Sequence, residues 1–173
     1  MTHGDPKNPK KNSHPVKRYE VTATADAPGA WDSVKGYLSF DVINKECVPR
    51  ESFTGGQNVP TVDFNFEMKR VDERTWKGYF YRDFLQDEDY FGLGVCHWDI
   101  TQSSPIFNAH GEDFVPGSGL ENINPHVEYF KKSDFLNRSQ TDGGAPSSAD
   151  NLNVIHDPGA FFPITVTVKE AEL

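Results

Sequence analysis

The sequence predicts an all-β domain: an antiparallel β-sandwich or barrel of about seven or eight strands, with a long irregular insertion before the last strand. Three observations lead to this prediction. Apolar and polar residues alternate with a period of two between Val16 and Phe114, turn-forming clusters recur at short intervals, and no segment carries a long helical repeat. With 173 residues, the chain fits one domain and is long enough to bury a substantial core.

Each predicted strand has its own pattern. Segment 61–69 is the clearest, because apolar residues occupy every second position from Val62 to Met68. Segment 75–83 follows after the short turn 70–74 and should pair with it as a hairpin. The remaining predicted strands cover residues 16–25, 34–43, 94–102, 105–111 and 161–171.

Two regions fall outside this pattern. Residues 1–15 are polar and rich in Pro, Asn and Lys, so we expect a flexible N-terminal tether ahead of a single β domain at 16–173. Between residues 112 and 158 the alternation gives way to Gly, Pro, Ser, Asn and Asp, which predicts irregular loops, with a short helix at 126–136 as the candidate element. Irregular stretches of this length are often functional.

The N-terminal segment also bears on cellular location. It contains no apolar stretch, so it is not itself a signal peptide. A mature exported protein whose signal has been removed would begin in this way, and so would a cytosolic protein with a disordered start.

The net charge of −9 limits the partners that the protein is expected to bind. Nucleic acid phosphates need a basic stripe and anionic lipids need clustered cations, so neither partner is expected. No apolar run approaches the roughly 20 residues that a membrane-spanning helix requires. A protein partner is compatible with this charge.

The chain has two cysteines, Cys47 and Cys96, and neither belongs to a CxxC pair. Zinc binding by cysteine pairs and thioredoxin-type chemistry therefore have no support in the spacing of the cysteines. We predict a disulfide between them, which requires an oxidising compartment and would contribute roughly 4 kcal/mol in the loop-entropy model. The alternative is a pair of buried thiols that act as small apolar residues.

The connection before the strand at 94–102 combines acidic and aromatic residues. We predict that it helps to bind a protein partner, because aromatic side chains anchor interfaces and charges steer association. The predicted partner-binding residues are Asp87, Glu88, Asp89, Tyr90 and Phe91. Two alternatives stay open: a solvated acidic loop without a ligand, and a calcium site, although the spacing does not match an EF-hand.

Candidates for catalysis are few. Cys96 and His97 are adjacent, so on a strand they point to opposite faces and cannot act together as nucleophile and base. His97 and Asp99 share a face and could bind zinc with His110 from the next strand, which would suit a metal-dependent hydrolase. The sequence contains no GxSxG, HExxH or Walker-type motif, and we predict no catalytic residue, resident metal or cofactor.

A further alternative is a calcium- or carbohydrate-binding β module. Exposed Trp31, Tyr79 and Tyr81 could stack on sugar rings. If Trp76 and Trp98 are buried in the core and no aromatic platform is exposed, the carbohydrate alternative loses its support.

Three stretches resemble a group of secreted lipoproteins of Gram-negative bacteria. They are TADAPGAWDSVKGYLSFDV at 24–42, TWKGYFYRDFLQDEDYFGLGVCHWD at 75–99 and FFPITVTVKEA at 161–171. The resemblance covers the β-rich part of the chain and fades over 112–158. Some members of the group look like immunity proteins, which are encoded beside the toxic effectors that they neutralise. These effectors are delivered by contact-dependent secretion systems.

The resemblance implies a periplasmic protein that blocks a cognate effector by steric occlusion, the effector being a lipase or phospholipase or a peptidoglycan hydrolase. It also implies a lipid anchor just ahead of the tail, where this chain has Met1, as the only contact with the membrane. Such a protein needs no active site. It needs a rigid scaffold, an oxidised bridge, a tether, and loops that present acidic and aromatic side chains.

Overall fold

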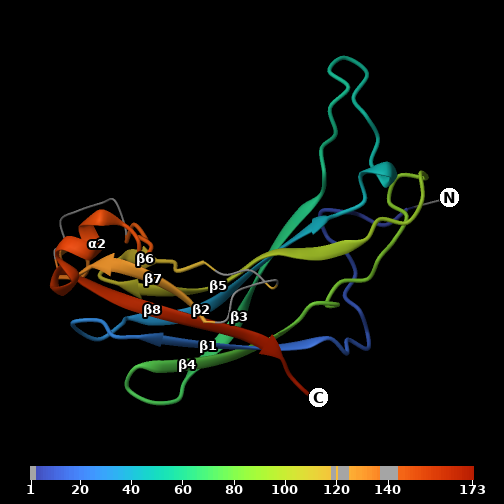
Figure 1. Ribbon diagram of the computed structural model, residues 1–173. Coiled ribbons are helices and arrows are strands. Elements are labelled where there is room, and N and C mark those ends of the chain that lie inside the picture. The colour runs from blue at the N-terminus through green and yellow to red at the C-terminus, as the bar shows by residue number, and fades with distance from the viewer. Residues whose placement is uncertain (1–2, 118–119, 121–124, 137–143) are drawn as a thin grey trace.

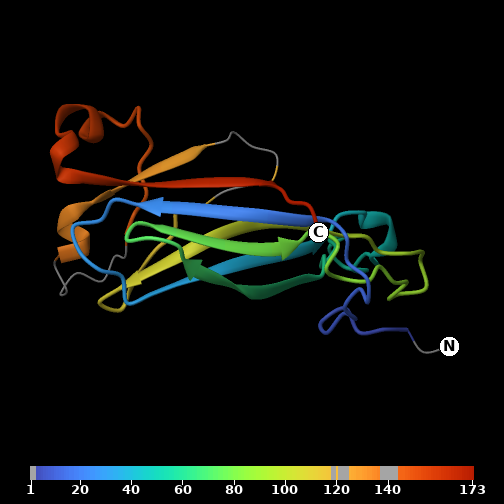
Figure 2. The same ribbon diagram turned by 90° about the horizontal axis from the view of Figure 1, so that it is seen from below.

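Eight antiparallel strands form one curved sheet that nearly closes on itself (Figures 1 and 2). The computed structural model describes residues 3–117, 120, 125–136 and 144–173. The strand order is β6-β5-β2-β3-β4-β1-β8-β7, which confirms the predicted antiparallel sandwich or barrel. The strands are β1 (Arg18–Ala25), β2 (Ser33–Val42), β3 (Thr61–Arg70), β4 (Thr75–Tyr81), β5 (Trp98–Ala109), β6 (Glu112–Phe114), β7 (His126–Lys131) and β8 (Phe161–Glu170). The short helical segments are η1 (Lys45–Cys47), α1 (Lys132–Leu136), α2 (Leu152–His156) and η2 (Pro158–Ala160).

A short junction between β3 and β4 divides the sheet into two layers. These strands pair only through Met68–Arg70 and Trp76–Gly78, so β6-β5-β2-β3 forms one layer and β4-β1-β8-β7 the other. The ring of Phe66 packs beside the junction against Gly36 and Gly78, where any Cβ would collide with neighbouring atoms. Glycine at these two positions therefore allows an aromatic ring to lie directly on the backbone.

The outer edges of the two layers are joined by the segment at 144–147. Phe114 of β6 forms a parallel bridge with Gly144, and Tyr129 of β7 forms an antiparallel bridge with Ser147. The backbone of Gly144 lies so close to the Phe114 ring that a Cβ there would overlap it. This segment therefore occupies one position on each free edge, where it blocks pairing with another chain.

The core between the layers consists largely of aromatic rings. The fully buried phenylalanines are Phe40, Phe107, Phe114, Phe130 and Phe162. Trp31 closes this cluster, with its ring centroid 5.0 Å from those of Phe107 and Phe135. Burying one such side chain contributes roughly 1.5–3 kcal/mol, so the aromatic content of the sequence accounts for much of the cohesion of the fold.

The prediction of two separate strands at 94–102 and 105–111 is wrong, because β5 runs unbroken from Trp98 to Ala109. A proline cannot donate to a strand ladder, yet Pro105 lies within this strand. Pro105 is tolerated because β5 pairs with β6 only through Phe107–Ala109, beyond the proline. On its other side, Pro105 lies opposite Gly36 of β2.

The predicted helix at 126–136 is also wrong over its first half. Residues His126–Lys131 form strand β7, and only Lys132–Leu136 is helical. β7 pairs in full with β8, so a long-range ladder overrides a weak local helical preference. The region at 112–158 is thus less irregular than we predicted, and its residues 118–119, 121–124 and 137–143 lie outside the described part of the chain.

The N-terminal segment lies against the connection that follows β4. Lys11 and Leu85 form an antiparallel bridge, flanked by hydrogen bonds from Asn12 N–H to the carbonyl of Phe84 and from Gln86 N–H to the carbonyl of Lys10, each 2.8 Å long. The segment that we predicted as a tether therefore contacts the domain in this structure, and its flexibility stays a prediction.

Candidate partner-binding surface

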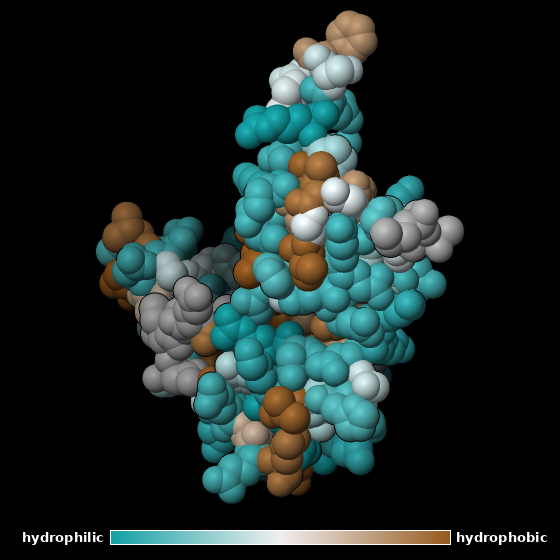
Figure 3. Space-filling view, turned by 90° about the vertical axis from the view of Figure 1, so that its right-hand side faces the viewer, coloured by the Kyte–Doolittle hydropathy of each residue, from teal (hydrophilic) through white to brown (hydrophobic). Residues whose placement is uncertain are grey.

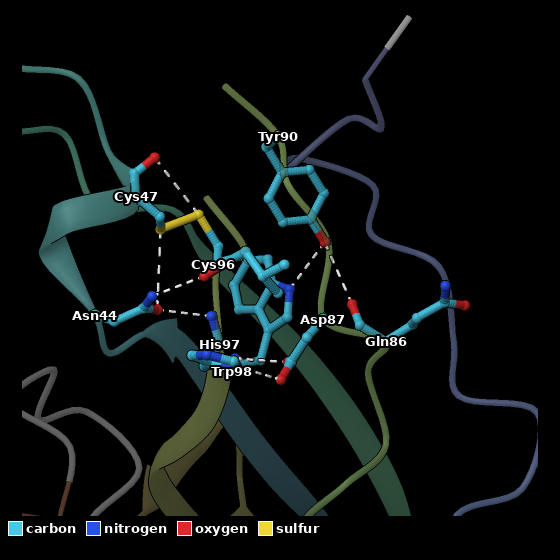
Figure 4. A network of polar contacts seen from close by, with 9 residues as sticks. Asn44, Cys47, Gln86, Asp87, Tyr90, Cys96, His97 and Trp98 are labelled. Atoms are coloured by element: carbon cyan, nitrogen blue, oxygen red, sulfur yellow. Dashed lines mark hydrogen bonds and ion pairs between the residues drawn. A yellow bond between two sulfur atoms is a disulfide. The ribbon is translucent and has the colours of Figure 1, made fainter. Parts of the chain in front are cut away.

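Two long connections lie at the end of the sheet that also holds the N-terminus (Figure 1). Residues 43–60 join β2 to β3, and residues 82–97 join β4 to β5. The predicted disulfide between Cys47 and Cys96 is confirmed and ties the two connections together, with the Cα atoms 5.4 Å apart and both residues fully buried (Figure 4). We call these two connections the bridged loops.

Polar bonds reinforce the disulfide. Asn44 donates from Nδ2 to the carbonyl of Val95 over 2.8 Å, and its Oδ1 accepts the N–H of His97 over 2.7 Å (Figure 4). The N–H of Ile43 also donates to the carbonyl of His97 over 2.9 Å. One asparagine side chain thus satisfies a donor and an acceptor of the opposite loop, which fixes the register between the loops.

Asp87 holds the end of the acidic connection on β5. Its Oδ1 accepts the N–H of Trp98 over 3.0 Å, and its Oδ2 lies 2.7 Å from Nδ1 of His97 (Figure 4). Both carboxylate oxygens therefore have partners within the protein. Asp87 is nevertheless exposed, so its outer side can still meet a partner.

Tyr90 points into the protein rather than toward solvent. Its side chain is 5% exposed, and its hydroxyl accepts the indole N–H of Trp98 over 2.9 Å (Figure 4). Burial raises the pKa of Tyr90 above its usual value, although the hydrogen bond from Trp98 acts in the opposite direction. This ring supports the loop from inside.

The other members of the predicted partner-binding set have mixed exposure. Glu88 is mostly covered, with one carboxylate oxygen 3.8 Å from Nζ of Lys10. Asp89 accepts the N–H of Gly92 over 2.7 Å, and Phe91 is half-buried. The structure brings these acidic and aromatic residues into one loop, and their role in partner binding stays a prediction.

An ion pair anchors the start of the same connection. Arg82 donates two 2.8 Å hydrogen bonds to the carboxylate of Asp99, one from Nε and one from a terminal nitrogen. This bidentate contact lowers the pKa of Asp99 below its usual value and raises the pKa of Arg82. Both carboxylate oxygens of Asp99 are therefore bonded to Arg82, which gives Asp99 a structural role.

The structure does not bring together the residues of the metal-dependent hydrolase alternative. His97 contacts Asp87, Asp99 contacts Arg82, and His110 follows the opposite end of β5. At roughly 3.3 Å per residue, the two histidines lie more than about 30 Å apart. Within the described residues, no three His, Cys, Asp or Glu side chains gather as a metal site.

The three aromatic residues of the carbohydrate alternative lie in two separate places. Trp31 belongs to the core cluster, while Tyr79 on β4 is 41% exposed and stacks under the guanidinium of Arg18. Trp76 and Trp98 are both buried. Tyr81 is partly buried and follows Tyr79 by two positions on the same face of β4, so these two tyrosines are neighbours, but Trp31 does not join them in a common platform.

Sequence reasoning missed the exposed apolar side chains of the bridged loops. Ile43, Leu93 and Val95 are 58%, 52% and 47% exposed, and Phe53 is 99% exposed. Figure 3 shows hydrophobic atoms below and at the tip of the projection on this side of the molecule. The signal was present in the sequence: Phe53 lies two residues ahead of the pair Gly55 and Gly56, and Leu93 lies between Gly92 and Gly94, so each is a large apolar residue in a glycine-containing segment.

Comparison of the chain with protein-family models, with curated proteins and with solved structures gives no match. None of the helices in the described part of the chain has the length and apolar character needed to cross a membrane.

Proposed function

We propose that this protein is an exported binding protein that neutralises an antibacterial effector by steric occlusion, with the bridged loops as its binding surface. The observation that carries the proposal is the exposure of Ile43, Leu93 and Val95 on two loops that a disulfide and polar bonds hold in place. Apolar side chains on a pre-ordered surface favour binding, because little conformational entropy is lost when a partner covers them.

The disulfide indicates a non-reducing, exported environment. Within the proposal, this environment is the periplasm, and the N-terminal segment connects the domain to a lipid anchor that is its only contact with the membrane. The target is an effector that acts in the same compartment, either a lipase or phospholipase or a peptidoglycan hydrolase. The resemblance to immunity-type lipoproteins supports this choice, and the acidic loop at 87–91 lies beside the apolar residues to steer association.

The test mixes the purified protein with the product of the adjacent gene. We expect a stable complex on size-exclusion chromatography and loss of the effector's phospholipid or peptidoglycan hydrolysis. Val95→Asp should weaken the complex at least about tenfold, because it places a charge in the apolar surface.

Val71→Asp is the matched control, since Val71 is 57% exposed in the turn between β3 and β4, at the other end of those strands from the bridged loops. Binding by the control should equal that of the unmodified protein. If the unmodified protein forms no complex and leaves the activity intact, the proposed function is wrong.

A further inference from the structure

The connection between β2 and β3 contains a hairpin that projects from the body of the protein (Figures 1 and 3). Its strands meet at the bridge between Arg50 and Gln57, and Phe53 lies in the turn between them. At 99% exposure, the Phe53 ring makes almost no contact with its own protein. Its whole apolar surface is therefore available to a partner.

Hydrogen bonds within the hairpin hold this turn in shape. Glu51 N–H donates to the carbonyl of Gly56 over 2.8 Å, and Gly55 N–H donates to the carbonyl of Glu51 over 2.9 Å. Gly55 has a φ of +68°, a left-handed conformation that glycine adopts without strain. Asn58 adds a 2.8 Å side-chain hydrogen bond to the carboxylate of Glu51.

The base of the hairpin is fixed to the domain. The side-chain amide of Gln57 donates to the carbonyls of Lys45 and Val48, both over 2.8 Å. Cys47 lies between these two residues and is bonded to Cys96 of the other loop. The exposed ring is thus carried on a stem that is attached at its root by a covalent bond and by polar contacts.

We propose that the hairpin at 49–57 is a plug whose tip residue, Phe53, enters an apolar pocket inside a cleft of the partner protein. This inference rests on the proposed function and names the part of the surface that performs the occlusion. A partner that covers the tip can also contact the base of the hairpin, where Leu93 lines a hollow together with Pro49, Arg50 and Gln57.

The shape and charge of the hairpin define the partner's site. A two-stranded ribbon has strands about 5 Å apart, so it fits a cleft better than a flat surface. Arg50 balances Glu51, which leaves the hairpin at 49–57 without net charge although the whole chain carries −9. An uncharged ribbon with an aromatic tip suits an apolar cleft, and the acidic chain disfavours insertion into an anionic membrane.

The test measures the affinity of the effector encoded by the adjacent gene for three forms of the full chain: unmodified, Phe53→Ala and Val71→Ala. We expect Phe53→Ala to weaken binding by roughly 30-fold or more, as for a central aromatic anchor, and Val71→Ala to leave it unchanged. Inhibition of the effector should fall in parallel. Equal melting temperatures and an intact disulfide show that the variants are folded.

A second measurement reports where the ring goes. Phe53→Trp places an indole at the tip, and its fluorescence should shift to shorter wavelength when the effector is added. The change in fluorescence that the effector causes in the unmodified protein, which already contains three tryptophans, is subtracted. The same shift with phosphatidylcholine and phosphatidylglycerol vesicles, but not with the effector, would overturn the plug and assign the tip to a membrane.

Failures of the two proposals are distinguishable. If the unmodified protein binds and inhibits the effector, and Phe53→Ala does so within about threefold of it, the plug is wrong and the proposed function stands. If the unmodified protein does not bind the effector, both are wrong.

Discussion

At one end of the sandwich, Trp31, Phe114 and Phe162 pack ring against ring with centroids 5.3–6.1 Å apart. At the other end, the bridged loops are joined by the disulfide, by Asn44 and by Asp87, while several of their apolar side chains face solvent. Cohesion at the first end comes from the burial of aromatic rings, whereas at the second end covalent and polar bonds add to the burial of side chains such as Val48, Leu85 and Tyr90. Loops whose shape depends partly on covalent and polar bonds can leave some of their apolar side chains exposed to a partner.

The largest effect is expected for Phe114→Ala, which removes a ring at the centre of the aromatic end. A large-to-small change in a packed core costs about 3–5 kcal/mol, because contacts are lost and a cavity remains. Urea unfolding followed by circular dichroism measures it. Phe53→Ala removes the same atoms from an exposed position and should change stability by less than about 0.5 kcal/mol. Equal losses in the two variants would remove the distinction between the ends.

The next effect is expected for the double substitution Cys47→Ser with Cys96→Ser. Loss of the cross-link should cost about 3–4 kcal/mol, because the unfolded chain regains the entropy of a long loop. Amide exchange should accelerate in residues 43–60 and 82–97, while β8 at the aromatic end keeps its protection. Uniform acceleration throughout the described strands would show that the disulfide supports the whole fold rather than the bridged loops.

The smallest effect is expected for Asp99→Asn, which breaks the ion pair with Arg82. Hydrogen bonds to charged groups contribute about 1.5–3 kcal/mol, and partial exposure places this pair toward the lower figure. The pKa of Asp99 is lower in the folded protein than in the unfolded chain, so the folded state binds fewer protons. The stabilisation by the Asp99 carboxylate is therefore complete when the pH is above about 3.9, the ordinary pKa of aspartate. It is lost as the pH falls below that value.

The check for Asp99 is the difference in unfolding free energy between the unmodified protein and Asp99→Asn, measured from pH 7 to pH 2. The difference should be constant down to about pH 4 and then shrink, because acid protonates the carboxylate in the unmodified protein. A difference that stays constant through the acid range would mean that Asp99 stabilises the loop without its charge.

Much of the fold was predictable because the strand pattern is local. Alternation from Val62 to Met68 placed one face of β3 toward the core, and the strand predicted at 161–171 corresponds to β8, in which Ile164 and Val166 are buried. The two cysteines predicted the bridge, since they were the only possible pair in the sequence. In each case, neighbouring residues or a unique pairing carried the information.

The candidate site was less predictable. We predicted that Tyr90 of the acidic connection contacts a partner, but its side chain is buried and its hydroxyl accepts the indole N–H of Trp98. The sequence around Phe53 is that of an ordinary glycine-containing turn, and it does not indicate that the side chain is almost fully exposed. Exposure of a loop side chain depends on which distant segment packs against it, and single-sequence periodicity holds no such information.

The sequence by itself determined the class of the fold, the faces of its clearest strands and the disulfide, because a period of two and one cysteine pair allow few arrangements. The tertiary structure decided that β5 continues through Pro105, that His126–Lys131 pairs as a strand, and that Phe53 stands clear of the domain. These outcomes depend on contacts between residues far apart in the chain. The energies of these long-range contacts outweigh the local conformational preferences of single segments. The contacts form only when the strands assemble.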